Sequence, residues 1–433
     1  MAVMELFENI LTGERTSCYK TNYFHMVVDG DILYPNIQDM SDKNFGTFIH
    51  EYIHYIQHLT TLFGVRMCDI FNKLAILYRE KIAQNDVIQL PLEISDTYVQ
   101  NFLEYYKNVR GDNGCNHNVD AVDVLSCDIE AARINVTAVN IGCYDFENDK
   151  IYEKGFLFGY TCVIESMAHA VQKLFCDELN HSAIPYSTAE LVLKELYPKW
   201  NVDQRLIASI CYCALQWNNP GIGFFEVARI AMAHPELNGC ELYRFIMKYE
   251  VSYKEQQLSM GNLLMKFMNE FKVNLKQLIG TSLIYYSSVI DSCIKEVQDS
   301  TSFLLDVLYN VSATDKAEFF NILAKHYGYP YIEANNIVVS PCKIGDVIQP
   351  RSYLETAVLL GWETLVSRFR ESGGNLACIR FPFCQKWMYV EEAGHPVTED
   401  CVQSPWKKKE TCLFTQCMKY YGFENKTFVE RPK

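Results

Sequence analysis

Three residues in the segment Phe48–Gly64 have the types and the spacing of a hydrolytic metal site. His50, Glu51 and His54 form the pattern His-Glu-x-x-His within FIHEYIHYIQHLTTLFG. On an α-helix, side chains four residues apart lie one turn apart on the same face, so the two histidines can bind one metal ion. Glu51 is rotated by about 100° from His50. In this pattern such a glutamate reaches a water on Zn²⁺ and takes its proton as the water attacks a carbonyl.

The rest of the segment favours an amphipathic helix with the histidines on its polar side. Gln57 and Thr61 extend the histidine face, and an adjacent apolar face is formed by Ile49, Ile53, Ile56 and Phe63. The competing interpretation is a core or solvated helix without a metal. His58 lies eight residues after His50, a rise of about 12 Å along a straight helix. It therefore cannot share the ion, and we expect a structural or substrate-side role for it.

A catalytic zinc site needs a third protein ligand and one open position. The sequence resembles the gluzincin metallopeptidases, in which a glutamate on a later helix supplies that ligand and often opens a Glu-small-x-Ala pattern. The segment IESMAHAV matches this pattern with Glu165, Ser166 and Ala168. The resemblance covers about residues 20–180 and rests on these two short motifs. It implies a zincin-like core and Zn²⁺ held by His50, His54 and Glu165.

Other residues compete for the same roles. The third ligand has rivals in four acidic residues on the segment before Glu165: Asp120, Asp123, Asp128 and Glu130. His169 lies one helical turn after Glu165, where some gluzincins carry an acidic residue that orients a zinc histidine. We expect His169 to bond a carboxylate or to donate to the developing oxyanion; the alternative is a histidine satisfied at a helix contact. Tyr160 and His181 are further candidates for the oxyanion donor. The histidine helix is also similar to uncharacterised bacterial proteins with the pattern His-Glu-Tyr-x-His-Tyr-x-Gln.

The helices and strands that we predict around these residues indicate a mainly α (α+β) fold. We expect a zincin-like catalytic domain over residues 1–240, a helical region over 241–330 and a Cys-rich α/β module over 331–433. The segment YFHMVVDGDILYP predicts two strands around an Asp-Gly turn. Helices are predicted from Ser41-Asp42 to about Gly64 and over 155–176, and strands over 134–142 and 375–384. Capping boxes are predicted at Ser187/Glu190 and at Ser252/Glu255.

Composition limits the possible partners. The net charge of 39 − 53 = −14 argues against nucleic acid and anionic membrane surfaces. The start of the chain lacks a signal-peptide pattern, and seventeen cysteines fit a reducing cytoplasm. The nearest C-terminal pairs, Cys378/Cys384 and Cys412/Cys417, do not have the Cys-x₂-Cys spacing of a zinc ribbon.

The sequence therefore predicts a cytoplasmic zinc peptidase with a restricted protein or peptide substrate, and a regulatory protein is a further candidate partner. Two alternatives stay open. The chain could be a helical interaction protein with a structural metal or none, or a metal hydrolase of non-peptide amides.

Overall fold

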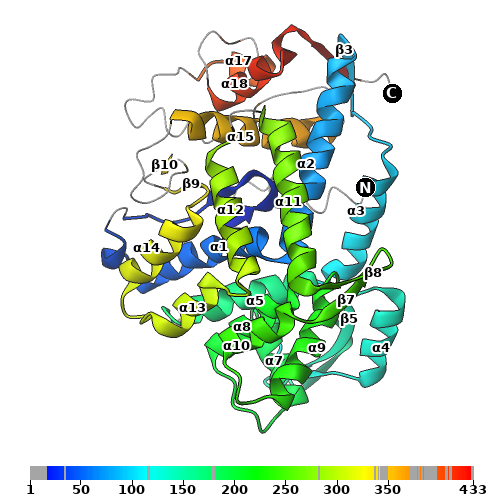
Figure 1. The fold of residues 1–433 in the computed structure, drawn as a ribbon, viewed down its shortest axis with the longest axis vertical. Coiled ribbons are helices and arrows are strands. Elements are labelled where there is room, and N and C mark those ends of the chain that lie inside the picture. Colours follow the sequence, from blue (N-terminus) through cyan, green and yellow to red (C-terminus); the bar gives the residue numbers. More distant parts are fainter. Residues whose placement is uncertain are drawn as a thin grey trace.

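The computed structural model describes residues 17–33, 36–114, 118–176, 181–280, 283–335, 338–339, 341, 350–370, 378, 381, 384, 397–404, 408 and 412–430. These residues are mostly helical, with small sheets of two to four strands, so the prediction of a mainly α fold is confirmed (Figure 1). No helix in this part of the chain combines the length and the apolar character needed to cross a membrane.

The elements that hold the candidate residues are few, and the others surround them. The helices not introduced below are α3 (Thr97–Arg110), α6 (Ala183–Tyr186), α8 (Gln204–Ala214), α9 (Pro220–Ala233) and α17 (Asp400–Gln403), with short 3₁₀ turns at Thr21–Tyr23, Ile37–Asp39 and Phe423–Asn425.

Helix α1 (Asp42–Thr60) carries the His-Glu-x-x-His pattern through the centre of the molecule. Its start agrees with the sequence, because the Ser41 side chain accepts a hydrogen bond from the Asn44 amide. The predicted end at Gly64 is wrong, since Thr61 is extended and caps the next helix, α2 (Leu62–Ala83). A Cβ at Gly64 would lie 2.5 Å from the Gln57 carbonyl oxygen, so this close turn between the two helices requires glycine.

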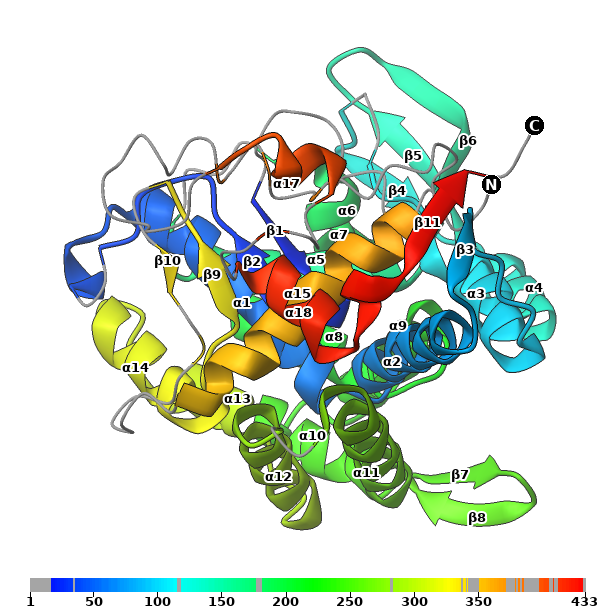
Figure 2. The same cartoon turned by 90° about the horizontal axis from the view of Figure 1, so that it is seen from above.

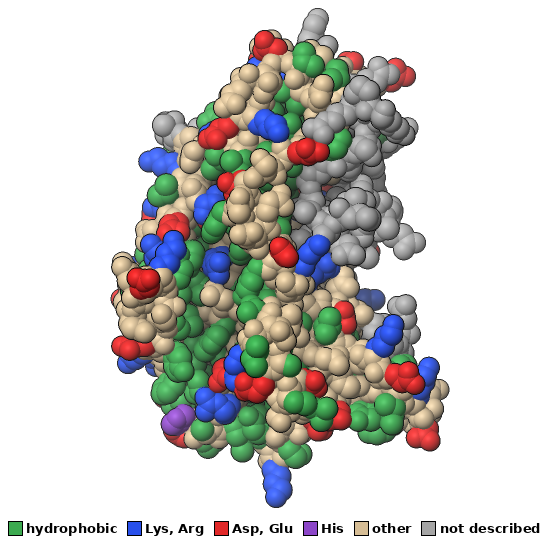
Figure 3. Space-filling view, turned by 90° about the vertical axis from the view of Figure 1, so that its right-hand side faces the viewer, with side chains coloured by type: hydrophobic (Ala, Val, Ile, Leu, Met, Phe, Trp, Pro, Cys, Tyr) green, Lys and Arg blue, Asp and Glu red, His purple; other side chains and the backbone are tan. Residues whose placement is uncertain are grey.

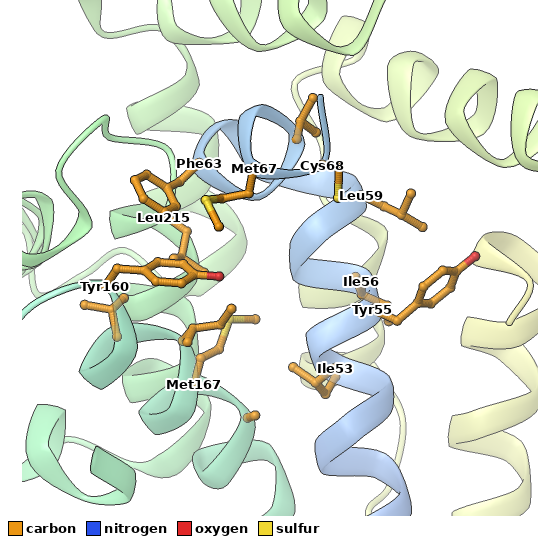
Figure 4. Close-up of a cluster of buried hydrophobic side chains, with 14 of the residues drawn as sticks. Ile53, Tyr55, Ile56, Leu59, Phe63, Met67, Cys68, Tyr160, Met167 and Leu215 are labelled. Atoms are coloured by element: carbon orange, nitrogen blue, oxygen red, sulfur yellow. The ribbon is translucent and has the colours of Figure 1, made fainter. Parts of the chain in front are cut away.

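Helix α5 (Tyr160–Lys173) packs directly against α1. Most apolar side chains of α5 are buried, and Figure 4 shows Tyr160 and Met167 of this helix in one cluster with Ile53, Ile56 and Leu59 of α1 and Phe63 and Met67 of α2. Because burial of apolar area stabilises the contact, this packing fixes the face of α5 that carries Glu165 beside α1.

The prediction that this helix starts at residue 155 is wrong. Residues 150–158 form strand β6 (Lys150–Phe158), which pairs antiparallel with β5 (Val139–Asp145), which in turn pairs with β4 (Ala121–Asp123). Phe156 and Phe158 are buried on one face of that sheet and Leu157 is exposed, an alternation that is typical of a strand. The strand predicted over 134–142 starts later than expected, because helix α4 (Ser126–Asn135) occupies its first residues.

The N-terminal β element exists, but its pairing differs from the predicted hairpin. Strand β2 (His25–Val27) pairs with β1 (Cys18–Lys20), which precedes it, and the residues 31–33 that were expected to pair with it form no strand. On its other side β2 pairs in parallel with β9 (Tyr331–Glu333), which pairs with β10 (Val338–Val339). A distant strand therefore replaces the local partner that the Asp-Gly pattern indicated.

Both predicted capping boxes are absent from the described structure. Ser187 precedes α7 (Thr188–Leu196) without a side-chain cap bond, and Ser252 lies in the hairpin of β7 (Glu250–Tyr253) and β8 (Gln256–Ser259). The box forms instead between Asn238 and Glu241, at the start of α10 (Gly239–Met247). The helical character predicted from 241 to 330 then appears as α11 (Met260–Ile279), α12 (Tyr285–Gln298), α13 (Phe303–Asn310) and α14 (Lys316–Tyr327).

C-terminal elements join N-terminal ones through hydrogen-bonded sheets. Besides the β2–β9 pair, β11 (Thr427–Glu430) pairs in parallel with β3 (Val87–Leu90). Helix α15 (Pro350–Arg370) packs on α18 (Leu413–Tyr420) and lies across the ends of α11 and α12 (Figures 1 and 2). These contacts cross the boundary predicted at 330, which stays a prediction. The strand predicted over 375–384 lies almost wholly outside the described residues.

A buried ionic network ties α15 to the N-terminal sheet. The Glu363 carboxylate accepts hydrogen bonds from Lys20 and from the His25 ring, the latter at 2.8 Å. Burial alone would raise the pKa of Glu363, but its two cationic partners lower it to about 2. The carboxylate is therefore stabilised in its charged form at neutral pH.

Candidate metal centre

Two helices bring three potential ligand atoms together. The Nε2 atoms of His50 and His54 lie 3.2 Å apart, and Glu165 Oε2 lies 3.1 Å from the first and 3.4 Å from the second. The histidines come from α1 and the glutamate from α5. Among the described residues, these three form a group of His and Glu side chains whose ligand atoms are close enough to hold one metal ion. The structure thus brings together the three residues that the sequence proposed as ligands.

Two glutamines fix the orientation of the histidine rings. Gln57 Nε2 donates to the Ile164 carbonyl at 3.0 Å, so its Oε1, 2.8 Å from His54 Nδ1, can only accept. His54 Nδ1 must then carry a hydrogen, which leaves the Nε2 lone pair facing the cluster when the ring is neutral. Gln172 Oε1 lies 3.0 Å from His50 Nδ1 and acts in the same way on the second ring. Partners of this kind accompany metal-binding histidines and hold their tautomer.

Positive charge at the centre of this arrangement would stabilise it. Two ring lone pairs and a carboxylate oxygen point at one another, and without positive charge among them they repel. Burial opposes a charge on His54, but Glu165 beside it raises the His54 pKa to about 9 in the absence of a metal. Burial likewise opposes the charge on Glu165, yet the two histidines hold its pKa well below the usual range. A metal ion would satisfy all three atoms at once, whereas a single proton bridges only two of them.

The spacing of the three atoms fits tetrahedral zinc. Zinc binds imidazole nitrogen and carboxylate oxygen at about 2.0–2.2 Å, and a tetrahedral angle then places neighbouring ligand atoms about 3.3–3.6 Å apart. The observed separations of 3.1, 3.2 and 3.4 Å are close to that range. Three ligands also leave the fourth position open, as in catalytic zinc sites. The donor set therefore fits Zn²⁺ without rearrangement of the two helices.

Glu51 lies beside this cluster and outside it. Its side chain is buried, and a backbone hydrogen bond from Tyr19 in β1 holds its carboxylate. Burial raises the pKa of Glu51, and the nearby Glu165 adds to that effect, while His50 and His54 oppose it. A carboxylate with a raised pKa beside a metal site would be suited to accept and return a proton.

A ring cluster borders the site on the α5 side. The His181 ring lies 5.3 Å from that of His169, 6.4 Å from that of His50 and 4.6 Å from that of Tyr186. Burial lowers the pKa of His169 to about 3, with Lys173 adding to the effect, so this ring is neutral at ordinary pH. Its Nδ1 has no hydrogen-bond partner among the described residues. His169 does not orient a ligand histidine, a role that Gln172 fills.

Tyr160 and His58 form a hydrogen bond with each other and contribute none of the three ligand atoms. The Tyr160 hydroxyl lies 2.9 Å from His58 Nε2, and His58 Nδ1 donates to the His54 carbonyl at 2.6 Å. Burial lowers the pKa of His58 to about 3, so its ring stays neutral. His58 contributes no atom to the three-residue group, and Tyr160 is committed to a structural bond.

The rival ligands lie elsewhere. Glu130 pairs with Arg133 on the exposed α4, while Asp120 and Asp123 bond the Phe146 amide and the Tyr144 hydroxyl in and beside the β4–β6 sheet. Asp128 is on α4 as well. The described C-terminal cysteines form no group with metal-ligand spacing, and Cys342 lies outside the described residues.

Two residues with a place in the site were missed by the sequence reasoning. Gln172 follows Glu165 by seven residues, which is two turns on one helix face, so its spacing could have indicated it. Tyr186 gave no local signal, because its position depends on how α6 packs against α5. Burial raises the Tyr186 pKa, and the charges of Glu165 and Glu51 add to the rise.

Comparisons of the chain with family models, with curated proteins and with solved structures gave no match. The assignment of a function therefore depends on the geometry of this site.

Proposed function

We propose that this chain is a zinc-dependent peptidase of the gluzincin type, with His50, His54 and Glu165 as metal ligands and Glu51 as general base. The observation that carries the proposal is the convergence of three ligand atoms at 3.1–3.4 Å, with a glutamine holding Nδ1 of each histidine. A helix without a metal has no need for two rings that present their lone pairs to one carboxylate.

The chemistry is divided between the ion and the chain. Zinc held by three protein ligands supplies a Lewis acid that polarises a carbonyl and lowers the pKa of water. Glu51 takes the proton from the attacking water at its carboxylate and returns it to the departing amine nitrogen. The raised pKa of Glu51 supports this cycle, because a carboxylate with a pKa nearer to neutral takes the proton from water more readily.

Tyr186 and His181 are the proposed donors to the developing oxyanion. Both rings border His50, at 5.8 Å and 6.4 Å between ring centroids. His181 is exposed, and Tyr186 is partly buried with a protonated hydroxyl. A donor placed at the charge that forms in the transition state typically contributes about 2.7–4 kcal/mol. This assignment keeps His181 from the sequence prediction and replaces Tyr160 with Tyr186. His169 would contact the His181 ring, whose centroid is 5.3 Å away, and would help to position it.

A peptide substrate is favoured by the strand beside Glu51. Strand β1 is an end strand of the four-stranded sheet, and Tyr19 within it holds the Glu51 carboxylate. An extended peptide can pair with such an end strand through backbone hydrogen bonds. His50, Glu51 and His54 are each less than a tenth exposed, whereas the Glu165 side chain is 24 % exposed. Because a substrate can reach these residues only from the side of Glu165, we expect the site to accept a restricted range of substrates.

The test compares protein termini in cells that express the wild-type chain, Glu51→Gln or a control, Glu104→Gln, on the exposed face of α3. The proposal predicts new termini with the wild type and the control and none with Glu51→Gln. A wild-type chain that holds zinc and yields no new termini would favour a hydrolase of other amides. Full biological activity of Glu51→Gln would show that the chain acts by binding.

A further inference from the structure

A cleft separate from the metal centre opens on the side of the molecule that carries α3. It has a volume of about 540 Å³ and lies between α2, α3, α11, the α8–α9 connection and the β7–β8 hairpin. Figure 3 views this side, where hydrophobic side chains gather among scattered charged ones. Pockets for small ligands typically measure about 300–1,000 Å³. None of its lining residues belongs to the metal centre.

The charge of the cleft is opposite to that of the whole chain. The chain has a net charge of −14, yet no aspartate or glutamate lines the cleft, and its two charged lining residues are Arg66 and Arg133. Arg133 already pairs with Glu130 and Glu226 at the rim. Arg66 forms no ion pair with the described residues. A small anion would therefore be attracted to Arg66, and no acidic side chain lines the cleft to repel it.

Arg66 is held in place with part of its hydrogen-bonding capacity unused. Its Nη1 donates to Asn218 Oδ1, and its guanidinium lies 5.5 Å from the Phe102 ring and 5.1 Å from the Phe267 ring. Its Nε is buried and has no hydrogen-bond partner among the residues that the structure describes. An unpaired buried donor on a cation carries a desolvation penalty that an anionic ligand would remove. The two rings fix the guanidinium, so it would bind such a ligand with little loss of side-chain entropy.

Five aromatic rings line the cleft together with aliphatic side chains. They come from three separate elements: Tyr98, Phe102 and Tyr105 from α3, Trp217 from the α8–α9 connection and Tyr253 from the hairpin. Side-chain amides are available between them, and that of Asn101 has no partner within the described structure. Rings of this kind stack on planar ligands, and amides recognise the polar edge of a heterocycle.

We propose that this cleft binds a small anion that carries a planar ring, such as a mononucleotide or an aromatic carboxylate. The anionic group would pair with Arg66, and the ring would lie against the aromatic walls. Leu62, the first residue of α2, lines the cleft, and Gln216 bonds its amide. The ligand would therefore contact the connection that ends the histidine helix α1.

The test measures binding of four probes to the full chain by titration calorimetry: adenosine 5′-monophosphate, adenosine, ribose 5-phosphate and indole-3-acetate. The proposal predicts that the nucleotide, the aromatic acid or both bind, and that adenosine and ribose 5-phosphate bind at least about tenfold more weakly than the nucleotide if it is the ligand. The nucleotide and indole-3-acetate arms separate phosphate from carboxylate as the anionic group. Equal affinity for adenosine and its monophosphate, or no binding of any probe at about 1 mM, would overturn the proposal.

Two variants then locate the site. Arg66→Met should weaken the bound probe roughly 10- to 100-fold, because a charge-assisted hydrogen bond is lost. The control Arg229→Met removes an exposed arginine of α9 outside the cleft and should leave the affinity unchanged. Unchanged affinity in Arg66→Met would contradict the assignment. If that variant does not fold, the site is tested by the quenching of tryptophan fluorescence when the probe binds. Quenching that persists in Trp217→Phe would contradict the assignment of the probe to this cleft.

Discussion

Replacing Gln172 tests whether the glutamines prepare the histidines for a metal. Gln172→Leu removes the oxygen that lies 3.0 Å from His50 Nδ1 and keeps a side chain of similar volume. The three ligand atoms themselves stay in place. Without its acceptor, Nδ1 of the buried ring loses its hydrogen bond, and the tautomer that presents Nε2 to the site is no longer favoured.

The expected loss can be bounded from the contacts. A neutral hydrogen bond contributes about 0.5–1.5 kcal/mol, and a buried donor left without a partner costs about 1–3 kcal/mol. Partners of metal-binding histidines are worth about 10–100-fold in affinity, which corresponds to about 1.4–2.8 kcal/mol. We therefore expect Gln172→Leu to weaken zinc binding by roughly 10- to 100-fold.

The assay is competition for Zn²⁺ with a chelator of known affinity. The matched control is Gln277→Leu, the same substitution on the exposed face of α11. The control should bind zinc as the wild type does. If Gln172→Leu folds, as judged by circular dichroism, and holds zinc as tightly as the control, the argument from ring orientation is refuted.

Three further predictions concern the surroundings of the site. Tyr160→Phe should leave metal affinity and turnover unchanged and lower the free energy of unfolding by about 1–2 kcal/mol, because the His58 ring loses its partner; a loss of turnover in a folded, zinc-bound variant would return Tyr160 to the catalytic residues. Tyr186→Phe should lower kcat by about 100-fold with little change in KM or zinc content; an unchanged kcat would exclude it as a donor. The pKa of Glu363 is lowered from 4.5 to about 2 on folding, so its contribution of at most about 3 kcal/mol is complete above pH 4.5 and is lost as pH falls towards 2. Chemical denaturation across this range should show a flatter dependence on pH in Glu363→Gln, and an unchanged slope would contradict the assigned ionic network.

Part of the candidate site could be predicted from the spacing of residues along one helix. The positions of His50 and His54 on one helix face follow from helix geometry, whereas Glu165 was proposed from the resemblance of its segment to the gluzincin pattern. His58 could be set apart by the same geometry. Gln172 was within reach of this reasoning, because it is two turns from Glu165 on one helix.

The failures arose where distant segments decide the local structure. Residues 155–158 were predicted as the start of the following helix, and only pairing with β5 makes them a strand. The Asp-Gly pattern after β2 predicted a local hairpin, yet β9, more than 300 residues away, pairs with β2 instead. Ser252 and Glu255 have the spacing of a capping box, but they lie in and beside a hairpin strand. Tertiary contacts of this kind override short patterns.

The most direct test of the central claim is the zinc content of the reconstituted protein, measured by elemental analysis after removal of loosely bound metal. The wild type should retain about one zinc per chain, and His54→Ala and Glu165→Ala should lose it, while His181→Ala retains it. A folded wild-type chain that holds no zinc, or a Glu165→Ala variant that holds it as tightly as the wild type, would contradict the proposed centre.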